Sequence, residues 1–322
     1  MAVLKASDKT LSVRPSRRAR RENLAAYAFL SPWLIGVALF LVGPIVASMV
    51  LSLTDWNLLY EPSWVGTANY QEMFSGDDRF FWISVGVTLR YAIVAVPLYL
   101  VAGLGLALLL NLKLRGMYLF RTILFLPSVL SGVAVAILFA TLFNPDAGAI
   151  NDVLRALGIH DPPRWLSSPT WALPAVIIIG LWGVGGGSII FLAGLQNINP
   201  SLYDAASIDG AGPIARFRHI TLPMLSPTLL FVLLTGLIGA FQFFDIAYVL
   251  GNGGVGGSGG GMGGSLRFYL LHMWLSGFSD GRFGYASAMA WLLVVVAGLV
   301  ILVVFRTASR RVFYEEDPEQ RG

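Results

Sequence analysis

Six long apolar segments limit the fold of this chain more strongly than any other feature of the sequence. Each has about 20 or more mostly apolar residues, which is the length that a helix needs to cross roughly 30 Å of hydrocarbon. Lipid cannot satisfy the backbone groups of an open strand, so every segment is predicted to be helical. The segments are residues 25–53, 81–110, 119–143, 171–195, 225–250 and 283–305.

The composition also indicates a membrane protein and excludes several kinds of site. Hydrophobic residues make up 56% of the chain and charged residues only 12%, whereas soluble domains have about 25% charged residues. The absence of cysteine excludes disulfides, thiolate metal sites and cysteine nucleophiles. His160, His219 and His272 lie far apart without ligand spacing, so no metal site is predicted. The first apolar segment is too long for a cleaved signal peptide.

The basic residues predict the orientation of the chain in the membrane. With the N-terminus inside, the cytoplasmic segments hold sixteen Lys and Arg residues and the outer loops only five, which is a clear positive-inside bias. The five are Arg79, Arg155, Arg164, Arg267 and Arg282, and Trp56, Trp64, Trp82, Trp165 and Trp171 are predicted to form an outer aromatic belt. Because the cations are distributed in this way, a nucleic-acid-binding surface is excluded.

These observations predict an all-α polytopic membrane protein with six transmembrane helices and both termini in the cytoplasm. Residues 1–24 would be a basic cytoplasmic tail, 25–306 the transmembrane domain, and 307–322 a second cytoplasmic tail. Residues 251–264, with ten glycines in fourteen positions, are predicted to be an outer loop, either a plain linker or a ligand-binding loop.

The longest polar cytoplasmic loop, residues 196–222, is predicted to contain a short helix. Asn199 and Pro200 are a typical helix start, because asparagine caps the first turn and proline fits its first position. Gly210 and the Gly212-Pro213 pair would end the helix. Such a helix could be built for contact with a partner, or it could rest on the membrane surface.

A motif in this loop resembles a known family. The loop reads Tyr203-Asp204-Ala205-Ala206-Ser207-Ile208-Asp209-Gly210, and Ile220-Thr221-Leu222-Pro223 follows. This resembles the EAA motif of binding-protein-dependent ABC importer permeases, in the form that is typical of the carbohydrate-uptake, maltose-type branch. Further similar motifs are Ser31-Pro32, Asp55-Trp56, Asn69-Tyr70, Phe120-Arg121-Thr122, Phe125-Leu126-Pro127, Phe143-Asn144-Pro145 and Phe283-Gly284-Tyr285. The chain departs from the family in having Asp204 in place of Glu, Arg90 within a span, and the glycine-rich loop.

The resemblance implies the type I ABC importer permease fold and a coupling function for the loop helix. Asp204, Ala205, Ala206, Asp209 and Gly210 would contact a cytoplasmic ATPase subunit. The small alanines permit close approach, and Gly210 permits a turn that a side chain would obstruct. Asp204, expected near the first helical turn, would be favoured by the helix dipole and could pair with an arginine of the partner.

The partners that the resemblance implies would supply the ATP-binding site that this sequence lacks. None of the three lysines follows a glycine, so no phosphate-binding Gly-Lys motif is present. The chain is therefore predicted to bind no cofactor and not to be an enzyme, with ATP and Mg on a separate ATPase dimer. A second homologous permease and an extracytoplasmic solute-binding protein would complete the transporter, located in a bacterial or archaeal cytoplasmic membrane.

Candidate pathway residues come from two spans. In the fifth, Gln242, Phe243 and Asp245 could bind a sugar, since Gln242 and Asp245 are three apart and would share a helix face. The alternative is that Asp245 lies at the outer interface and the phenylalanines only pack. By resemblance, Trp182, Gly183 and Gly186 of the fourth span are candidates, with packing as their alternative function, and Arg90 either serves the pathway or snorkels outward.

The predicted function is alternating-access import of a sugar or sugar-like solute, driven by ATP hydrolysis on partner subunits. One rival is a self-sufficient secondary transporter, which would need an ion-coupling site and usually shows a hydropathy repeat. A second rival is an integral-membrane enzyme, which would need clustered acids, histidines or a nucleophile at the membrane surface. The sequence presents none of these features.

Overall fold

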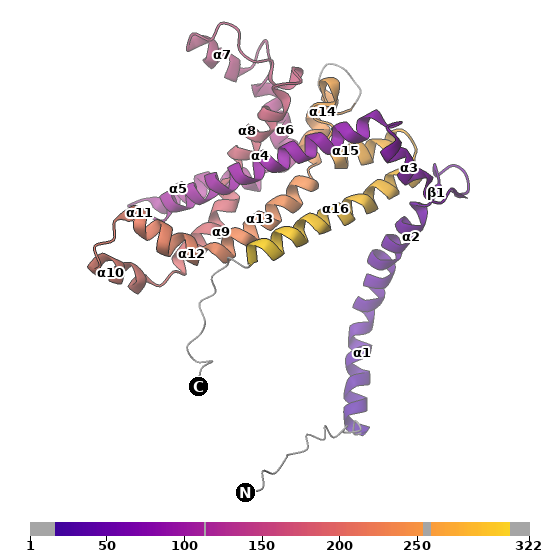
Figure 1. Ribbon diagram of the computed structural model, residues 1–322, viewed down its shortest axis with the longest axis horizontal. Coiled ribbons are helices and arrows are strands. Elements are labelled where there is room, and N and C mark those ends of the chain that lie inside the picture. The colour runs from indigo at the N-terminus through magenta and orange to yellow at the C-terminus, as the bar shows by residue number, and fades with distance from the viewer. Residues whose placement is uncertain (1–16, 113, 254–258, 310–322) are drawn as a thin grey trace. The chain divides into compact units, whose positions relative to one another are not determined.

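The computed structural model describes residues 17–112, 114–253 and 259–309 (Figure 1). The predicted cytoplasmic tails lie largely outside these ranges, as does the centre of the glycine-rich segment 251–264. The described chain divides into two units, residues up to Leu51 and residues from Ser52 onward.

The first unit is a single long helical segment. It consists of α1 (Arg17–Val37), the π-helical turn η1 (Ala38–Val42) and α2 (Gly43–Leu51). From Leu24 to Leu51 it is long and apolar enough to cross a membrane by length and composition.

The second unit is built around the 32-residue helix α4 (Arg79–Leu110). Its buried residues recur every three to four positions, as in Val87, Tyr91, Ala95 and Val96, and therefore form one face. That face packs mainly against α9 (Gly185–Gln196), α13 (Ser226–Phe241) and α15 (Tyr269–Trp274), and α8 (Ala172–Trp182) also contacts α4. The last helix, α16 (Phe283–Ser309), packs along α13 and is again long enough to span.

The remaining elements are short and lie mostly between these helices. They are β1 (Thr54–Asp55), β2 (Ser63–Trp64), α3 (Ala68–Ser75), α5 (Met117–Phe125), η2 (Leu126–Val129), α6 (Gly132–Leu142), α7 (Ala149–Ala156), η3 (Trp165–Ser167), α10 (Pro200–Ile208), α11 (Pro213–Arg216), η4 (Phe217–Thr221), α12 (Leu222–Met224), α14 (Asp245–Gly253), η5 (Met262–Gly264) and η6 (Leu275–Ser279). β1 and β2 form one antiparallel pair, with Thr54 opposite Trp64.

Two of the predicted spans are not straight helices. In the third, α5 and η2 meet α6 at 96°, and in the fourth, α8 meets α9 at 49°. Pro127 removes a backbone donor near the first break, and the extended residue Ser131 restarts the helix by accepting a hydrogen bond from Ala134 N. Four helices among the described residues pass as spans by length and composition, or six if each bent pair is one span, so the count of six stays a prediction.

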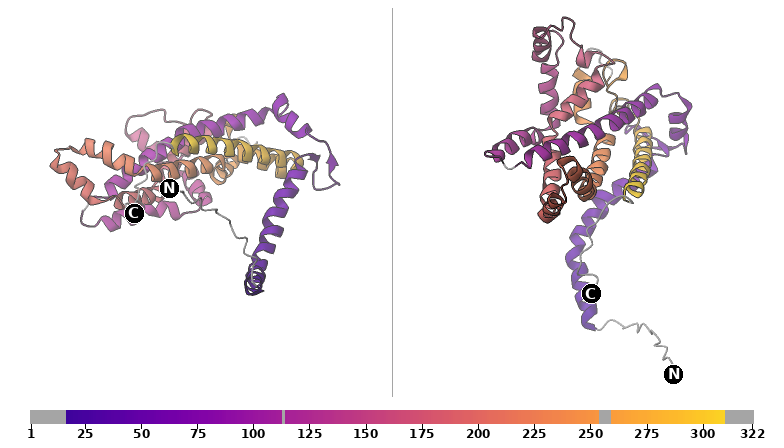
Figure 2. Two further views of the ribbon diagram at one scale, coloured as in Figure 1. Left: turned by 60° about the horizontal axis from the view of Figure 1, so that its bottom comes forward. Right: turned by 60° about the vertical axis from the view of Figure 1, so that its left-hand side comes forward.

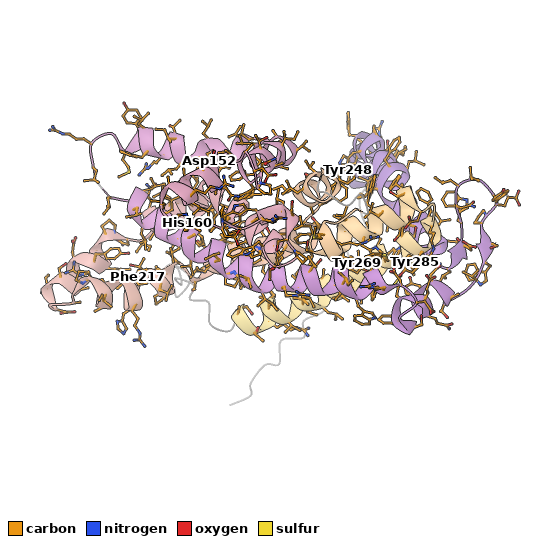
Figure 3. The ribbon with its side chains drawn as sticks, turned by 90° about the horizontal axis from the view of Figure 1, so that it is seen from above. Asp152, His160, Phe217, Tyr248, Tyr269 and Tyr285 are labelled. Carbon is orange, nitrogen blue, oxygen red and sulfur yellow. The ribbon has the colours of Figure 1, made fainter. Side chains whose placement is uncertain are left out.

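The second unit places the loop with α10 and α11 at one end, and α3 and α15 at the other, as Figure 1 and the left view of Figure 2 show. The side-chain view agrees, since Phe217 of the loop and the pair Tyr269 and Tyr285 lie at opposite ends (Figure 3). We call the end that holds α3 and α15, together with the α6–α8 connection, the outer side, following the predicted orientation.

One aromatic prediction is wrong. Trp165, predicted to belong to an interfacial belt, is only 8% exposed and packs between the tilted ring of Phe143 (ring centroids 4.8 Å apart) and the edge-on ring of Trp171 (5.6 Å). Its indole N–H donates to Asn151 at 2.7 Å, so both its apolar ring and its polar atom are satisfied inside the protein. Trp165 is therefore a core residue of the outer segment.

Candidate functional site

The loop helix α10 forms as the sequence predicted. Asn199 is its N-cap, with the side-chain oxygen accepting from Ser201 N at 3.0 Å, and Pro200 occupies the first helical position. At the other end, Gly210 has φ +74°, and the helix closes with Gly210 N–Ser207 O (3.2 Å) and Ala211 N–Ala206 O (2.8 Å) hydrogen bonds. These two bonds define a Schellman motif, which needs a left-handed residue at the glycine position.

The structure also explains how α10 is held against the body of the loop. Tyr203 and Thr221 of η4 share a hydrogen bond between their hydroxyls at 2.9 Å. Arg216 of α11 donates from Nε to Ala211 O at 2.7 Å, directly after the Schellman motif. The end of α10 is thus tied to α11 and its middle to η4, which are the segments that lead toward α13.

The predicted coupling residues present an open surface. Asp204, Ala205 and Asp209 are exposed and Ala206 is half-buried. Beside them, Ile208 and Ile214 are 88% and 83% exposed, so two large apolar side chains project from a polar loop. Exposed apolar side chains rimmed by charge are typical of protein-binding surfaces.

One detail of the coupling prediction is wrong. Asp204 is the fifth residue of α10, and the first turn of the helix contains no acid. The helix dipole acts mainly on the first turn, so it gives Asp204 little stabilisation. A pairing of its exposed carboxylate with an arginine of a partner does not depend on the dipole and stays a prediction.

The candidate pathway residues fall into two separate hollows. Gly183 lines a cavity of about 310 Å³ among α4, α8, α9 and α13, together with Tyr91, Tyr99 and Gly236. Tyr99 donates its hydroxyl to Ile177 O at 2.9 Å and lies 3.4 Å from the Tyr91 hydroxyl. Sequence reasoning missed both tyrosines, because nothing local distinguishes them from packing residues.

Gln242 and Asp245 line a second, more open hollow of about 470 Å³ with residues of α15 and α16. The expectation that they share one helix face is wrong, because α13 ends at Phe241 and α14 begins at Asp245. Gln242 leaves the helical region (φ −99°, ψ 16°), so the chain turns between the two side chains. The structure nevertheless brings them to one hollow, and both are exposed there.

Three other candidates make packing contacts. Trp182 meets Phe139 edge to face at 5.5 Å, and Phe243 stacks between Tyr91 (4.7 Å) and Phe268 (4.6 Å). Gly186 faces Ser128 so closely that an added Cβ would lie 2.7 Å from the serine Cβ. For these residues the alternative interpretation, packing, agrees with the geometry.

Arg90 is exposed on the face of α4 that the rest of the unit leaves uncovered. Its Nε donates to Gly86 O at 3.1 Å, one turn nearer the outer end of α4. The side chain therefore folds back in the direction that snorkelling to the outer surface requires.

Sequence reasoning also missed a polar cluster at the outer end of α4. Asp78 caps α4, accepting from Phe80 N and Phe81 N, and its second oxygen accepts from His272 Nε2 and Tyr285 OH, each at 2.7 Å. His272 Nδ1 accepts from Arg267 Nε at 3.2 Å, which leaves Nε2 as the protonated nitrogen that donates to Asp78. The cluster joins α4, α15 and α16.

Electrostatics stabilise this cluster. Burial raises the pKa of Asp78, but the hydrogen bonds from His272, from Tyr285 and from the backbone N–H of Phe80 outweigh it and hold that pKa well below its usual value. Burial lowers the pKa of Arg267, whose guanidinium lies 3.9 Å above the ring of Phe80. His272 is only 3% exposed, so its hydrogen bond to Asp78 is largely shielded from water.

Comparison with known proteins agrees with this architecture. The fold is that of ABC importer permeases: the crystal structure of a bacterial ABC transporter involved in the import of the acidic polysaccharide alginate aligns with a TM-score of 0.77 and 25% identity, over 91% of this chain and 98% of that one. Residues 99–314 match the family of binding-protein-dependent transport system inner membrane components, and the chain belongs to that family.

Curated relatives cover nearly the whole chain. A probable ABC transporter permease protein, YesP of Bacillus subtilis, is 42% identical over 96% of this chain and 98% of its own length. The lactose transport system permease LacF of Rhizobium radiobacter is 36% identical, over 91% and 96%. The chain is therefore a multi-pass membrane permease of the binding-protein-dependent class.

Proposed function

We propose that this chain is the transmembrane permease subunit of an ATP-driven importer that moves a sugar or sugar-like solute into the cytoplasm by alternating access. Relatives named for lactose and for trehalose and maltose support the solute class. The similar alginate transporter, solved in complex with a saccharide-bound periplasmic protein, supports an extracytoplasmic solute-binding partner. A second homologous permease and an ATPase dimer holding ATP and Mg complete the assembly in a bacterial or archaeal cytoplasmic membrane.

The observation that carries the proposal is the rigid, exposed loop helix α10. Its surface of Asp204, Ala205 and Ile208, with Asp209 beside the Schellman glycine Gly210, is exposed and would dock in a groove on an ATPase subunit. Closure of the ATPase dimer on ATP would move α10, and the Tyr203–Thr221 and Arg216–Ala211 hydrogen bonds would carry that motion toward α13. Because α13 lines the first candidate hollow and α14, which follows it in the chain, lines the second, the movement would reach the solute pathway.

Purification of the tagged chain from its own organism tests this assembly. We expect an ATPase, a second permease and a solute-binding protein to co-purify, and ATP hydrolysis to rise when the loaded binding protein is added. If the chain alone, reconstituted in vesicles, took up solute on an ion gradient without ATP, the secondary-transporter alternative would replace the proposal.

We propose that the second hollow is part of the solute pathway, and substitutions of the residues that line it test this. Gln242→Ala and Asp245→Ala should each weaken uptake several-fold, because one lost hydrogen bond to a bound polar group costs on the order of 1 kcal/mol. Assembly with the ATPase should persist, since both side chains line a hollow with residues of α15 and α16 and neither belongs to the loop that contains α10. Uptake kinetics equal to wild type in both variants would remove these residues from the pathway.

A further inference from the structure

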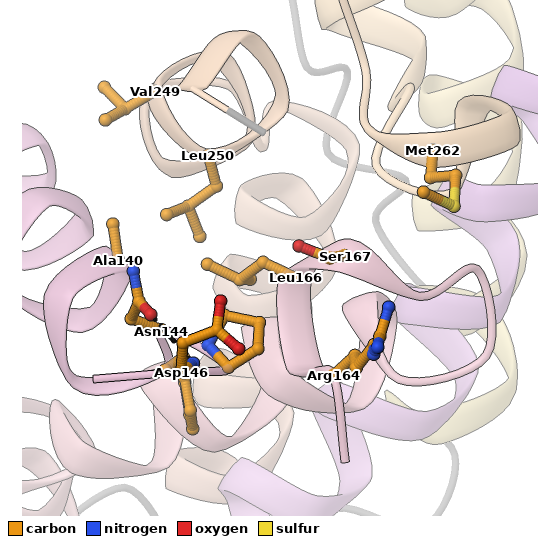
Figure 4. Close-up of a pocket in the computed structure, with 11 residues that line it drawn as sticks. Ala140, Asn144, Asp146, Arg164, Leu166, Ser167, Val249, Leu250 and Met262 are labelled. Carbon is orange, nitrogen blue, oxygen red and sulfur yellow. Dashed lines mark hydrogen bonds between the residues drawn. The ribbon is translucent and has the colours of Figure 1, made fainter. Parts of the chain in front are cut away.

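A hollow on the outer side of the second unit is not used by the mechanism proposed above. It has a volume of about 390 Å³ and lies where α6 and α14 end and the connection between α6 and α8 begins. Small-ligand sites usually have about 300–1,000 Å³, so a small solute would fit. Figure 4 shows Asp146 and Arg164 on either side of Leu166, with Ser167 between them and Leu250 above.

The polar residues of this hollow stand on a rigid framework. Asn144 Oδ1 accepts from the backbone N–H groups of Asp146 and Ala147, each at 3.0 Å. Asn151 is 1% exposed and donates from Nδ2 to Pro145 O (3.1 Å) and Pro163 O (3.3 Å). The backbone on each side of the hollow is thus tied to one buried side chain, which fixes the positions of Asp146 and Arg164.

Three side chains at the hollow are able to form hydrogen bonds with a ligand. Within the described parts of the chain, the carboxylate of Asp146, the guanidinium of Arg164 and the hydroxyl of Ser167 have no side-chain partner. A carboxylate accepts from hydroxyl groups and a guanidinium donates to them. Leu166, Leu250 and Val249 supply an apolar wall, which suits the C–H face of a sugar ring. Acceptor, donors and an apolar surface together match a saccharide.

The position of the hollow connects it to the candidate pathway. α6 and α14 pack side by side. At their inner ends Gly132 meets Asp245, since a Cβ added to Gly132 would lie 3.4 Å from the Cβ of Asp245. At their outer ends Ala140 and Leu250 line the hollow. The two hollows therefore lie at opposite ends of one helix pair.

We infer that the hollow around Asp146, Arg164 and Ser167 is an outer saccharide subsite, which receives the solute before it reaches Gln242 and Asp245. This inference rests on the proposed function. Asp146 would accept hydroxyl groups of the sugar, and Arg164 and Ser167 would donate to its oxygens. The subsite is distinct from the pathway hollow because the two share no lining residue.

Cysteine protection tests the subsite directly, since the chain has no cysteine of its own. The Ser167→Cys variant is assembled in the complete transporter in membrane vesicles and treated with a membrane-permeant thiol reagent. Lactose, maltose and an alginate pentasaccharide serve as probes, each with its binding protein where one is required. We expect a transported probe to slow labelling several-fold. Ser63→Cys, at an exposed site in β2, is the control and should be unaffected.

Transport kinetics provide the second arm. Asp146→Asn and Arg164→Gln should each raise the KM of uptake on the order of tenfold, because each removes a charge-assisted hydrogen bond. Asp77→Asn and Arg79→Gln make the same chemical changes at exposed outer positions away from the hollow and should leave KM unchanged. Co-purification of the ATPase checks that every variant assembles.

The outcomes separate the subsite from the proposed function. Protection together with raised KM supports the subsite. If the wild type imports a probe, but Ser167→Cys is unprotected and KM is unchanged in both variants, the subsite is wrong and saccharide import stands. If the wild type imports none of the three probes, saccharide import itself fails for them and the subsite falls with it.

Discussion

At the scale of single residues, the backbone geometry of Gly210 provides a test of the coupling proposal. Its φ of +74° is a conformation that L-residues with side chains adopt at a cost, and β-branched residues most of all. An added Cβ would meet no atom within 4 Å, so space does not explain the glycine. The need for glycine here therefore arises from the Schellman motif that ends α10.

This geometry makes a sharp prediction. Gly210→Val should distort the end of α10, at a cost of about 1–3 kcal/mol for a strained backbone, and should reduce uptake and ATPase co-purification. Gly210→Asn should retain most activity, because asparagine tolerates the left-handed region.

A neighbouring glycine provides the matched control. Gly212 has φ −70° and also has free space around a Cβ, so Gly212→Val should leave uptake near wild type. Equal uptake by Gly210→Val and Gly212→Val would contradict the coupling function of this turn.

At the scale of elements, Asp78 and its partners hold the outer ends of three helices together. Asp78 caps α4, His272 comes from α15 and Tyr285 from α16. A second link, the ion pair between Arg282 and Glu72, joins the start of α16 to α3, and the Arg282 guanidinium lies 4.3 Å above the ring of Tyr285. We therefore expect the outer ends of these helices to move as one body.

The low pKa of Asp78 predicts a pH dependence of stability. A carboxyl group whose folded pKa is depressed stabilises the fold above its unfolded pKa, about 3.9, and loses that contribution as the pH falls toward the folded value. Asp78→Asn should lower the free energy of unfolding by about 1–3 kcal/mol at neutral pH, since His272 loses its acceptor.

Thermal unfolding of the detergent-purified chain, measured from pH 7 downward, checks this dependence. The difference between wild type and Asp78→Asn should stay constant to about pH 4 and then shrink. Asp77→Asn is the control, because Asp77 is exposed and, among the described residues, its side chain bonds only Ser75. A difference that persisted unchanged below pH 4 would exclude ionised Asp78 as its source.

At the scale of the whole molecule, the orientation in the membrane follows from the distribution of basic residues. The loop 196–222 is predicted inside and the segment 144–170 outside. Ser201→Cys and Ser168→Cys can be treated in intact cells or spheroplasts with a membrane-impermeant thiol reagent. We expect labelling at position 168 alone. Labelling at position 201 without labelling at 168 would mean that the orientation is opposite to the predicted one. The end that we call the outer side would then face the cytoplasm.

Several elements followed from the sequence because their causes are local. A run of about 20 apolar residues matches the bilayer thickness whatever surrounds it, and the described residues include four helices that are long and apolar enough to span. Asn199 caps α10 through a bond to a residue two positions away, and Gly210 closes it through bonds within five positions. Interactions this short are contained in the sequence window that predicts them.

Only the tertiary structure decided the features that join distant parts of the chain. Asp78 and His272 are 194 positions apart, and their pairing depends on how α15 packs against α4. The turn at Gln242 brings that residue and Asp245 to one hollow without a shared helix face, and Trp165 is buried by contacts with Phe143 and Asn151. The sequence by itself determined the family, the caps of α10 and four helices of spanning length, since each depends on neighbouring residues. Polar partners and hollows depend on packing between helices, which no local pattern encodes.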